Sequence, residues 1–423
     1  MSSAGRRKRK GTGENQGATM KMGWQSKKLG DLCEIELGKT PARADKKFWD
    51  EKRETNNVWL SIADLLNAED NVVIDSKEYL SDKGAAISKT VRKGTLLASF
   101  KLTLGRLAFA GRDLFTNEAI AALTIFNERE LTKEFLFYFL HFFDWRKAAE
   151  NDVKLKGMTL NKAKLKELCV HFPSPSEQRR IVGILDKAFD GIATAKANAE
   201  KNLRNARELF ESHLQAIFTQ RGNGWVERKL GAVCAFLNRG VSPKYVNTGG
   251  IRVLNQRCIR NHQVTYEYSR RHDTLSKRVI EERLIRGGDV LVNSTGTGTL
   301  GRVAQLREEP VELTTVDSHV TIVRPTPGLF YPEFFGYALI TIEDTIKKAG
   351  EGCGGQTELA RAALAERFSI QFPKSVGEQR QIVTKLDALH VGTKNLEAIY
   401  KKKLAALDEL KKSLLRQAFH GQL

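Results

Sequence analysis

The sequence predicts an α+β protein in which two β-rich domains are separated by a long antiparallel two-helix coiled coil, with an internal pseudo-twofold repeat. Two observations support this prediction. The chain of 423 residues repeats a set of motifs at an offset of 201 residues. In each copy, short β-leaning runs precede a long segment whose apolar residues are three or four positions apart. Because solenoid units are much shorter, we interpret the repeat as the duplication of a whole domain with its connector.

The repeat keeps its register from the first domain to the C-terminus. Short motifs near the domain openings and the helix starts recur, and so do apolar residues near the helix ends. The matched pairs are Trp24 and Trp225, Gly30 and Gly231, Cys33 and Cys234, Glu177-Gln178-Arg179 and Glu378-Gln379-Arg380, Leu185-Asp186 and Leu386-Asp387, Leu214 and Leu415, and Phe218 and Phe419. We therefore expect the same frame twice.

Each copy opens with a β-leaning domain, for which we predict the bounds 22–173 and 223–373. Runs such as 94–99 and 289–294 have strand length and lie next to glycine. A stretch rich in Phe and Tyr follows in each copy and predicts a helix, Lys133–Leu140 in the first and Glu333–Leu339 in the second.

Each domain is followed by a predicted long helix, in segments 174–222 and 374–423. Ser174, Pro175 and Glu177 have the spacing of a capping box with proline at the first helical position, and Ser375 and Glu378 repeat the box. The apolar stripe of each helix is narrow, so pairing of the two helices is the simplest way to bury it. The short link between Phe218 and Trp225 favours antiparallel pairing. The alternative is that each helix packs on its own β domain.

Charge indicates a polyanionic partner. The net charge is +19, and residues 1–21 account for only +5 of it. A basic folded body suits nucleic acid, although a solvated basic surface without a partner is the alternative. We expect residues 1–21 to form a disordered basic tail and assign no function to it.

The five cysteines lack CxxC spacing, and we expect them to be thiols in a reducing cytoplasm without a structural zinc site. No apolar run approaches the ~20 residues that span a bilayer, so we expect no membrane partner. We found no catalytic motif, such as a P-loop or HExxH, and we expect no catalytic residue, metal ligand or cofactor in this chain.

Two motifs suggest enzymatic sites. The segment Gly296–Gly301 matches GxGxxG, and a nucleotide-binding enzyme that uses this loop is the alternative function. However, its counterpart at Lys101–Arg106 keeps only the final Gly-Arg, and a poor helix sequence follows Gly301. The segment Asp317-Ser318-His319 suggests a hydrolytic triad, but its counterpart near Asn117-Glu118-Ala119 has no histidine.

The loops of both domains carry side chains suited to DNA. Arg and Lys can bind guanine or phosphate, whereas Asn and Gln suit adenine. The predicted DNA-binding residues are Lys39, Arg43, Lys46, Lys101, Thr103, Arg106, Lys244, Gln256, Arg257, Asn293, Thr295 and Arg302. Regions 41–101 and 243–295, which hold most of them, have almost nothing in common. A repeated frame with two unrelated reading surfaces would recognise an asymmetric, two-part target.

From about Met22 to Leu423 the pattern resembles the specificity subunit of type I restriction-modification systems. The resemblance rests on the Phe-Pro … Glu-Gln-Arg-x-Ile-Val segments at 172–182 and 372–383, the Trp-x-x-x-x-Leu-Gly openings at Trp24 and Trp225, and the Gly-Arg turns at Gly105 and Gly301. It implies that the β-rich domains are target recognition domains, each reading half of a bipartite site in double-stranded DNA. The helices would then act as a molecular ruler.

The same resemblance implies the partners. Two methyltransferase subunits would dock on the helices, bind S-adenosylmethionine and methylate adenine at N6. Two restriction subunits, nuclease-translocases that use ATP with Mg, would complete the complex. This chain would be a non-catalytic subunit.

Overall fold

A computed structural model describes residues 23–150, 153–154, 157–220, 222, 224–350 and 358–423. The chain forms two compact units, and each is described by itself. Unit 1 is Met1–Asn198 with Lys403–Leu423, and unit 2 is Ala199–Lys402. The predicted tail 1–21 and Cys353 lie outside the described residues, and the predicted domain bounds remain predictions.

Unit 1 is built on a five-stranded sheet with the order β2-β10-β6-β8-β4, and a three-stranded sheet, β5-β3-β9, adjoins it. Strand β1 pairs with β13, and β11-β12-β7 form a further sheet. The elements are β1 Gln25–Lys28, α1 Leu29–Leu32, β2 Cys33–Leu37, β3 Val58–Leu60, β4 Val72–Val73, β5 Glu78–Tyr79, α2 Asp82–Ala86, β6 Leu96–Ser99, β7 Lys101–Leu102, β8 Leu107–Ala110, β9 Phe115–Thr116, β10 Ile120–Ile125, α3 Lys133–Phe142, α4 Trp145–Ala148, β11 Val153–Lys154, β12 Gly157–Thr159, α5 Lys162–Lys166 and β13 Cys169–Phe172, with short 3-10 turns at Lys46–Phe48 and Asp64–Asn67.

Unit 2 repeats this plan with a four-stranded sheet, β15-β24-β21-β22, and a second sheet, β16-β20-β17-β23. Strands β14 and β25 pair, as do β18 and β19. The elements are β14 Trp225–Lys229, α7 Leu230–Val233, β15 Cys234–Arg239, β16 Tyr245–Val246, β17 Ile251–Leu254, β18 Ile259–Arg260, β19 Gln263–Val264, β20 Arg270–His272, β21 Val290–Asn293, β22 Val303–Gln305, β23 Thr314–Val316, β24 Val320–Pro325, α8 Pro332–Thr341, α9 Glu343–Gly350, α10 Arg361–Arg367 and β25 Ser369–Pro373, with 3-10 turns at Gln256–Cys258 and Glu281–Arg283.

The strand and helix predictions within the domains are confirmed. The run 94–99 contains β6, the run 289–294 contains β21, and the Phe- and Tyr-rich stretches form α3 and α8. The secondary sheets also match, because β3 pairs in parallel with β9 as β17 does with β23. The duplicated frame is therefore present in the topology as well as in the sequence.

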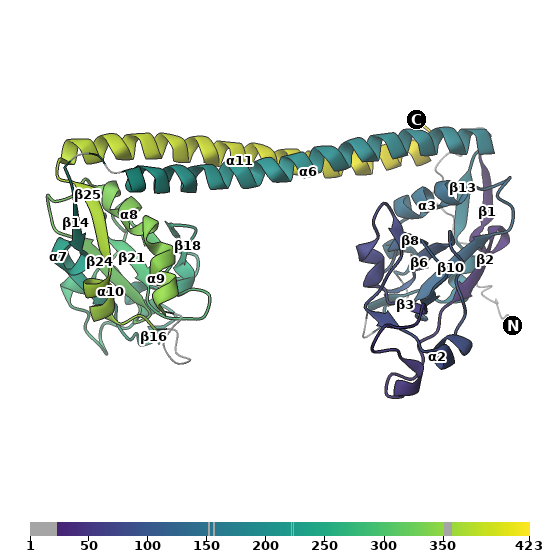
Figure 1. The fold of residues 1–423 in the computed structure, drawn as a ribbon, viewed down its shortest axis with the longest axis horizontal. Helices are drawn as coiled ribbons and strands as arrows, with labels where there is room; N and C mark the ends of the chain where they lie inside the picture. The colour runs from purple at the N-terminus through teal and green to yellow at the C-terminus, as the bar shows by residue number, and fades with distance from the viewer. Residues whose placement is uncertain (1–22, 151–152, 155–156, 221, 223, 351–357) are drawn as a thin grey trace, which may run out of the picture. The chain divides into compact units, whose positions relative to one another are not determined.

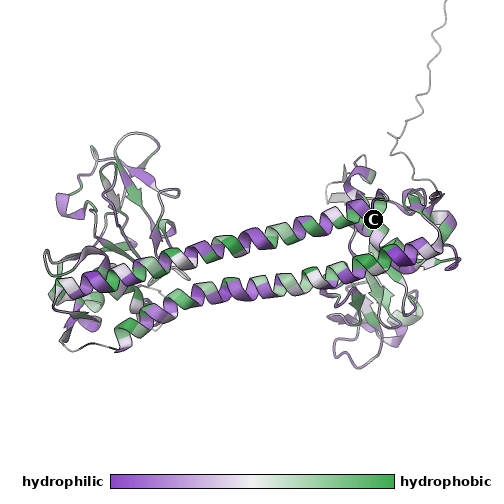
Figure 2. Ribbon diagram, turned by 90° about the horizontal axis from the view of Figure 1, so that it is seen from above, coloured by the Kyte–Doolittle hydropathy of each residue, from purple (hydrophilic) through white to green (hydrophobic). Residues whose placement is uncertain are grey.

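Two long helices, α6 Pro175–Gln220 and α11 Val376–Phe419, begin where the capping motifs predict. At α11 the backbone N–H of Glu378 donates to Ser375 Oγ over 3.3 Å, as an N-cap does. At α6, Ser174 Oγ lies 3.0 Å from Ser176 Oγ, while the Ser174 carbonyl accepts from Gln178 N–H. Figure 2 shows apolar residues alternating with polar ones along both helices.

The helices run antiparallel in each unit. In unit 1, Lys196 near the middle of α6 pairs with Asp408 in the later part of α11, with 2.7 Å between Nζ and Oδ1. In unit 2, Arg207 in the later part of α6 pairs with Glu397 of α11, with 3.3 Å between Nε and Oε2. The antiparallel prediction is confirmed. The alternative, in which each helix packs on its own β domain, is partly right as well, because the ends of both helices pack on the β-rich parts of the units.

Each core is closed by two helix ends from different repeats. In unit 1 the start of α6, with Ile181 and Leu185, and the end of α11, with Ala418, join one hydrophobic core. In unit 2 the end of α6, with Phe218, and the start of α11, with Leu386, do the same. Burial of such side chains is worth about 1.5–3 kcal/mol each, so the helix ends are strongly held.

Among the described residues, no helix is long and apolar enough to cross a membrane. The four described cysteines are free thiols. Burial raises the pKa of Cys33 and of its repeat partner Cys234 to about 12, so both thiols stay protonated and serve packing.

Candidate nucleic-acid interface

Two loops lie at the same position of the repeated sheet, Ser99–Arg106 in unit 1 and Asn293–Arg302 in unit 2. In each, the N–H of the first residue donates to the carbonyl of the last over 2.9 Å. The first residue's carbonyl accepts from the glycine before that arginine, Gly105 over 2.9 Å and Gly301 over 2.8 Å. Because both ends are matched, we define these two segments as the reading loops.

The glycine of each reading loop is required by its surroundings. Gly105 has φ +74°, and a Cβ built there would lie 2.5 Å from Cδ1 of the Trp145 ring. Gly301 has φ +82°, and its Cβ would lie 2.8 Å from the backbone nitrogen of Lys347. A side chain at either position would clash and would also strain the backbone. The Gly-Arg pattern therefore sets how the arginine leaves the sheet.

The unit 1 reading loop brings together three of the predicted residues, Lys101, Thr103 and Arg106. Thr103 and Arg106 are exposed, and both line a cavity of about 580 Å³. Lys101 Nζ lies 5.3 Å from the ring centre of Phe100. The arginine side chain has no hydrogen bond or ion pair within the described part of the chain, so it is free to bind an anion.

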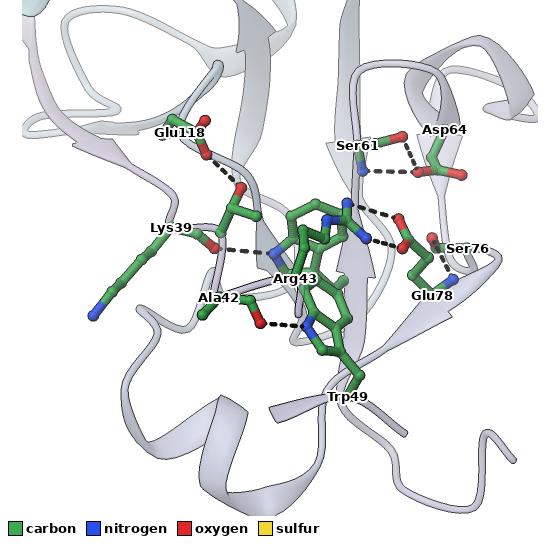
Figure 3. A network of polar contacts seen from close by, with 11 residues as sticks. Lys39, Ala42, Arg43, Trp49, Ser61, Asp64, Ser76, Glu78 and Glu118 are labelled. Carbon is green, nitrogen blue, oxygen red and sulfur yellow. Dashed lines mark hydrogen bonds and ion pairs between the residues drawn. The ribbon is translucent and has the colours of Figure 1, made fainter. Parts of the chain in front are cut away.

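A second segment of unit 1 holds the predicted residues Lys39, Arg43 and Lys46, and Figure 3 shows it from close by. Arg43 is engaged within the protein: its guanidinium pairs with Glu78 and lies 4.3 Å from the ring centre of Trp49 and 4.6 Å from that of Trp59. Lys46 forms a 3.1 Å ion pair with Glu51 and is largely exposed. We infer that Arg43 supports this segment more than it faces outward.

Lys39 has the opposite placement. Its backbone is held by two hydrogen bonds, because its N–H donates to the Thr116 carbonyl over 2.8 Å and its carbonyl accepts from Trp59 Nε1 over 3.0 Å. Its side chain is exposed and, within the described residues, makes no hydrogen bond or ion pair. Figure 3 shows it directed away from the network around Arg43.

Glu118 links the two segments of unit 1 electrostatically. Burial tends to raise the pKa of Glu118, but a hydrogen bond from Thr40 and the charges of Lys101 and Arg43 lower it below its ordinary value. The carboxylate therefore stays ionised and partly neutralises the basic surface. The structure thus brings the loop of Lys101 close to the segment of Arg43.

In unit 2 the structure gathers Gln256, Asn293, Thr295 and Arg302 around the reading loop. Gln256 Nε2 donates to Thr295 Oγ1 over 2.7 Å, and the Gln256 carbonyl accepts from Asn293 Nδ2 over 3.1 Å. Asn293 is fully buried and its Oδ1 lacks a partner in the described structure, so its amide faces the protein. Arg302 donates to the Gly298 carbonyl over 2.9 Å.

The remaining two predicted residues, Lys244 and Arg257, make separate contacts, although Arg257 follows Gln256 directly in the sequence. Lys244 is exposed, and its N–H donates to Nδ1 of the buried His272 over 2.9 Å. The Arg257 guanidinium stacks 4.3 Å from the ring centre of Tyr268. Neither side chain is placed by a hydrogen bond to the reading loop in the described residues.

Sequence reasoning missed a basic groove of about 1170 Å³ in unit 2. Arg302 lines it and was predicted, but most of its cations were not. These are Arg207, Arg252, Arg260, Arg307, Lys347, Lys394 and Lys401. The groove is not purely cationic, because Glu343 and Glu397 line it too. These cations come from segments that are distant in the sequence, and Arg252 lies 5.2 Å from the ring centre of Tyr266 only in the folded unit.

The alternative reading of Gly296–Gly301 as a dinucleotide site is not supported. The residues after the loop form strand β22, whereas a phosphate cradle needs the N-terminus of a helix there. The space beside the Gly296 Cα is also occupied by protein atoms, because a Cβ built there would lie 2.5 Å from Thr299 Oγ1. In the described residues, no three His, Cys, Asp or Glu side chains gather as metal ligands.

Fold and surface together define an internally duplicated protein that presents different basic side chains on two copies of one frame. The model of the family described as "Type I restriction modification DNA specificity domain" matches residues 21–203 and again residues 222–406, and the chain belongs to this family. Both copies of the repeat are thus specificity domains.

Individual relatives agree. The chain is similar to the type I restriction enzyme MjaIX specificity subunit of Methanocaldococcus jannaschii, with 28% identity over 200 residues. That match spans 45% of this chain and 43% of the relative, less than half of its length.

Two solved structures share the fold. A chain from a structure on complex assembly and conformational transition of the type I R-M system has a TM-score of 0.75 and 19% identity, covering 96% of this chain and 100% of that one. The HsdS subunit from Thermoanaerobacter tengcongensis has a TM-score of 0.59 and 19% identity, covering 96% and 98%.

Proposed function

We propose that this chain is the DNA-recognition subunit of a type I restriction-modification complex and that each unit reads one half of a bipartite, asymmetric site in double-stranded DNA. One observation carries the proposal. The reading loops are held by the same backbone hydrogen bonds, yet their side chains differ, with Lys101 and Thr103 in one loop and Thr295 and Thr299 in the other. Two readers on one frame suit two different half-sites.

Charge supports a duplex as the target. The net charge of +19 favours a polyanion, and releasing counterions from DNA phosphates would supply much of the affinity. The free cations Lys39 and Arg106 suit phosphate or guanine. Affinity would then fall steeply as salt rises.

The long helices support docking of partner subunits. Several large apolar side chains on them are exposed although the helices are paired. They are Ile184, Leu209, Val391, Leu396, Ile399 and Leu410. We propose that two methyltransferase subunits cover such positions and that two restriction subunits join the complex.

We also propose that the chemistry belongs to those partners. S-adenosylmethionine would bind to the methyltransferase subunits, and ATP with Mg to the restriction subunits. The target adenine would leave the duplex for a pocket in a methyltransferase subunit. This chain would act in the cytoplasm, where the DNA is, and would catalyse no step itself.

The spacing between half-sites is the third part of the proposal. Helices of 46 and 44 residues are about 69 and 66 Å long at 1.5 Å per residue. We propose that this length sets the number of base pairs between the two half-sites.

Mapping N6-methyladenine across the host genome, with and without the gene for this chain, tests the proposed function. One bipartite motif should lose its methylation when the gene is deleted. Methylation that persists at every motif would overturn the proposal. As a second measurement, the purified chain alone should transfer no methyl group from S-adenosylmethionine to DNA, and turnover would contradict its non-catalytic role.

A further inference from the structure

A chain of side-chain hydrogen bonds in unit 2 ends on an exposed histidine. Gln256 Nε2 donates to Thr295 Oγ1 over 2.7 Å, and Thr295 Oγ1 lies 2.7 Å from His319 Nδ1. The other end is held too, because Gln256 Oε1 accepts from Thr299 Oγ1 over 3.1 Å. The reading loop thus contributes both threonines, and a separate turn contributes the glutamine.

The hydrogen bonds around Thr295 accommodate the His319 tautomer that carries its proton at Nε2. Among the described residues, Thr295 Oγ1 has two partners, Gln256 and His319. Gln256 donates to one lone pair of Thr295 Oγ1, and the hydroxyl proton of Thr295 is available for donation to His319 Nδ1. An imidazole that accepts at Nδ1 carries its proton at Nε2. The neutral ring therefore presents an N–H donor on the side away from Thr295.

The backbone holds the ring in place. His319 N–H donates to Asp317 Oδ1 over 2.9 Å, and its carbonyl accepts from Ser294 N–H over 2.8 Å. The side chain is nevertheless exposed, and within the described residues its Nε2 has no partner. A donor with fixed direction and an open partner position is suited to reading a base edge.

The equivalent position in unit 1 lacks this donor. There the carbonyl of Ala119 accepts from Phe100 N–H over 3.1 Å, which is the bond that His319 forms with Ser294. The alanine methyl group cannot donate a hydrogen bond. The two units therefore differ at one matched point of the frame by the presence of a single oriented donor.

We propose that His319 is a specificity-determining residue of unit 2, which donates from Nε2 to an acceptor on the major-groove edge of one base, and that Thr295 and Gln256 are its positioning residues. The acceptors available are purine N7, guanine O6 and thymine O4, whereas cytosine presents an amino donor there. His319 therefore rejects cytosine at one position of one half-site. This inference rests on the proposed function.

The test is the methylated motif in cells that carry the chain together with its partner subunits. His319→Ala should admit cytosine at one position of one half-site, where the wild type methylates such sites at least tenfold less. Thr295→Val keeps the imidazole but removes the hydroxyl, and it should relax the same position. Thr295→Ser keeps the hydroxyl and should leave the motif unchanged. His171→Ala, at an exposed histidine of β13 in unit 1, is the matched control and should also leave the motif unchanged.

Three results would overturn the inference. The first is an unchanged methylation motif in His319→Ala. The second is a uniform partial loss of methylation over all sequences in that variant, which indicates a phosphate contact. The third is a relaxation of the motif by Thr295→Ser that is as strong as the relaxation by Thr295→Val. If His319→Ala abolishes methylation altogether, as distinct from a uniform partial loss, Thr295→Val decides, because it keeps the imidazole and removes only the hydroxyl group between Gln256 and His319. If no methylation in the cell depends on the wild-type chain, the proposed function itself is refuted. Failure of the inference and failure of the proposed function are therefore distinguishable.

Discussion

Gln178 and Gln379 make the same three hydrogen bonds in two different units. Each is fully buried in the first turn of a long helix. Oε1 accepts from a backbone N–H, of Thr132 in one unit and Tyr331 in the other, over 2.9 and 2.7 Å. Nε2 of Gln178 donates to the carbonyls of Glu130 and Pro173. Nε2 of Gln379 donates to those of Leu329 and Pro373. One glutamine thus fastens each helix start to the chain around it.

Replacing this glutamine should be costly. Gln178→Ala leaves one N–H and two carbonyls without partners in a buried site, and we expect unit 1 to lose about 2–4 kcal/mol of unfolding free energy. Gln379→Ala should have the same effect on unit 2. Denaturant unfolding measures both. The adjacent exposed Arg179→Ala should stay within about 0.5 kcal/mol, and an equal effect of Arg179→Ala and Gln178→Ala would contradict this assignment.

The free arginine and the engaged arginine of unit 1 should behave differently. Arg106→Ala should weaken specific DNA binding by about 1–3 kcal/mol, as should Arg302→Ala in unit 2, with little change in stability. Arg43→Ala should instead lower the stability of unit 1 by about 1–2 kcal/mol, because Glu78 and the two tryptophan rings lose their partner. Titrations with cognate and random duplexes, paired with thermal unfolding, separate the two. Unchanged affinity for Arg106→Ala would remove it from the interface.

Glu343 gives unit 2 a pH dependence. Burial tends to raise the pKa of Glu343, but hydrogen bonds from His262 and Lys347, the charge of His262 and the Val303 N–H lower it below its ordinary 4.5. Its contribution to stability is therefore present above pH 4.5 and is lost as the pH falls through the lower, folded-state pKa.

Glu343→Gln should accordingly cost about 2 kcal/mol at pH 7, and the difference from the wild type should shrink below pH 4.5. Urea unfolding at pH 7 and pH 4 measures this difference. The neighbouring Asp344→Asn is the control, because its side chain is 85% exposed and should matter little. If the difference in unfolding free energy between Glu343→Gln and the wild type grows toward acid pH, the predicted direction of the pH dependence is contradicted.

The helix length should set the spacer. The ion pairs Lys196–Asp408 and Arg207–Glu397 are eleven residues apart on both helices, so they share one register. Deleting residues 197–203 and 401–407 removes one heptad from each helix and keeps both pairs. The loss of about 10 Å corresponds to roughly three base pairs. The methylated motif should show a spacer shorter by that amount, and an unaltered spacer would refute the ruler.

The frame could be predicted from the sequence because its determinants are local and appear twice. Capping residues mark the helix starts, apolar spacing marks their buried face, and Gly105 and Gly301 mark the reading loops. The roles of individual basic residues could not be predicted. Arg43 is engaged because Trp49, Trp59 and Glu78 meet only in the folded unit, and Asn293 is buried because β21 runs through the core. The role of His319 could not be predicted because its counterpart near Ala119 has no histidine and because its partner Thr295 is distant in sequence.

The closure of each core by two helix ends has a consequence for the order of folding during synthesis. Unit 2 is one continuous stretch, Ala199–Lys402, so all of its core residues leave the ribosome together. Unit 1 is begun first, but Leu415 and Ala418, which complete its core, are made only after all of unit 2. Domains made first usually fold first. Here unit 1 must wait for residues that follow unit 2 in the chain, and a ribosome that stops short of residue 403 releases a complete unit 2 with an incomplete unit 1.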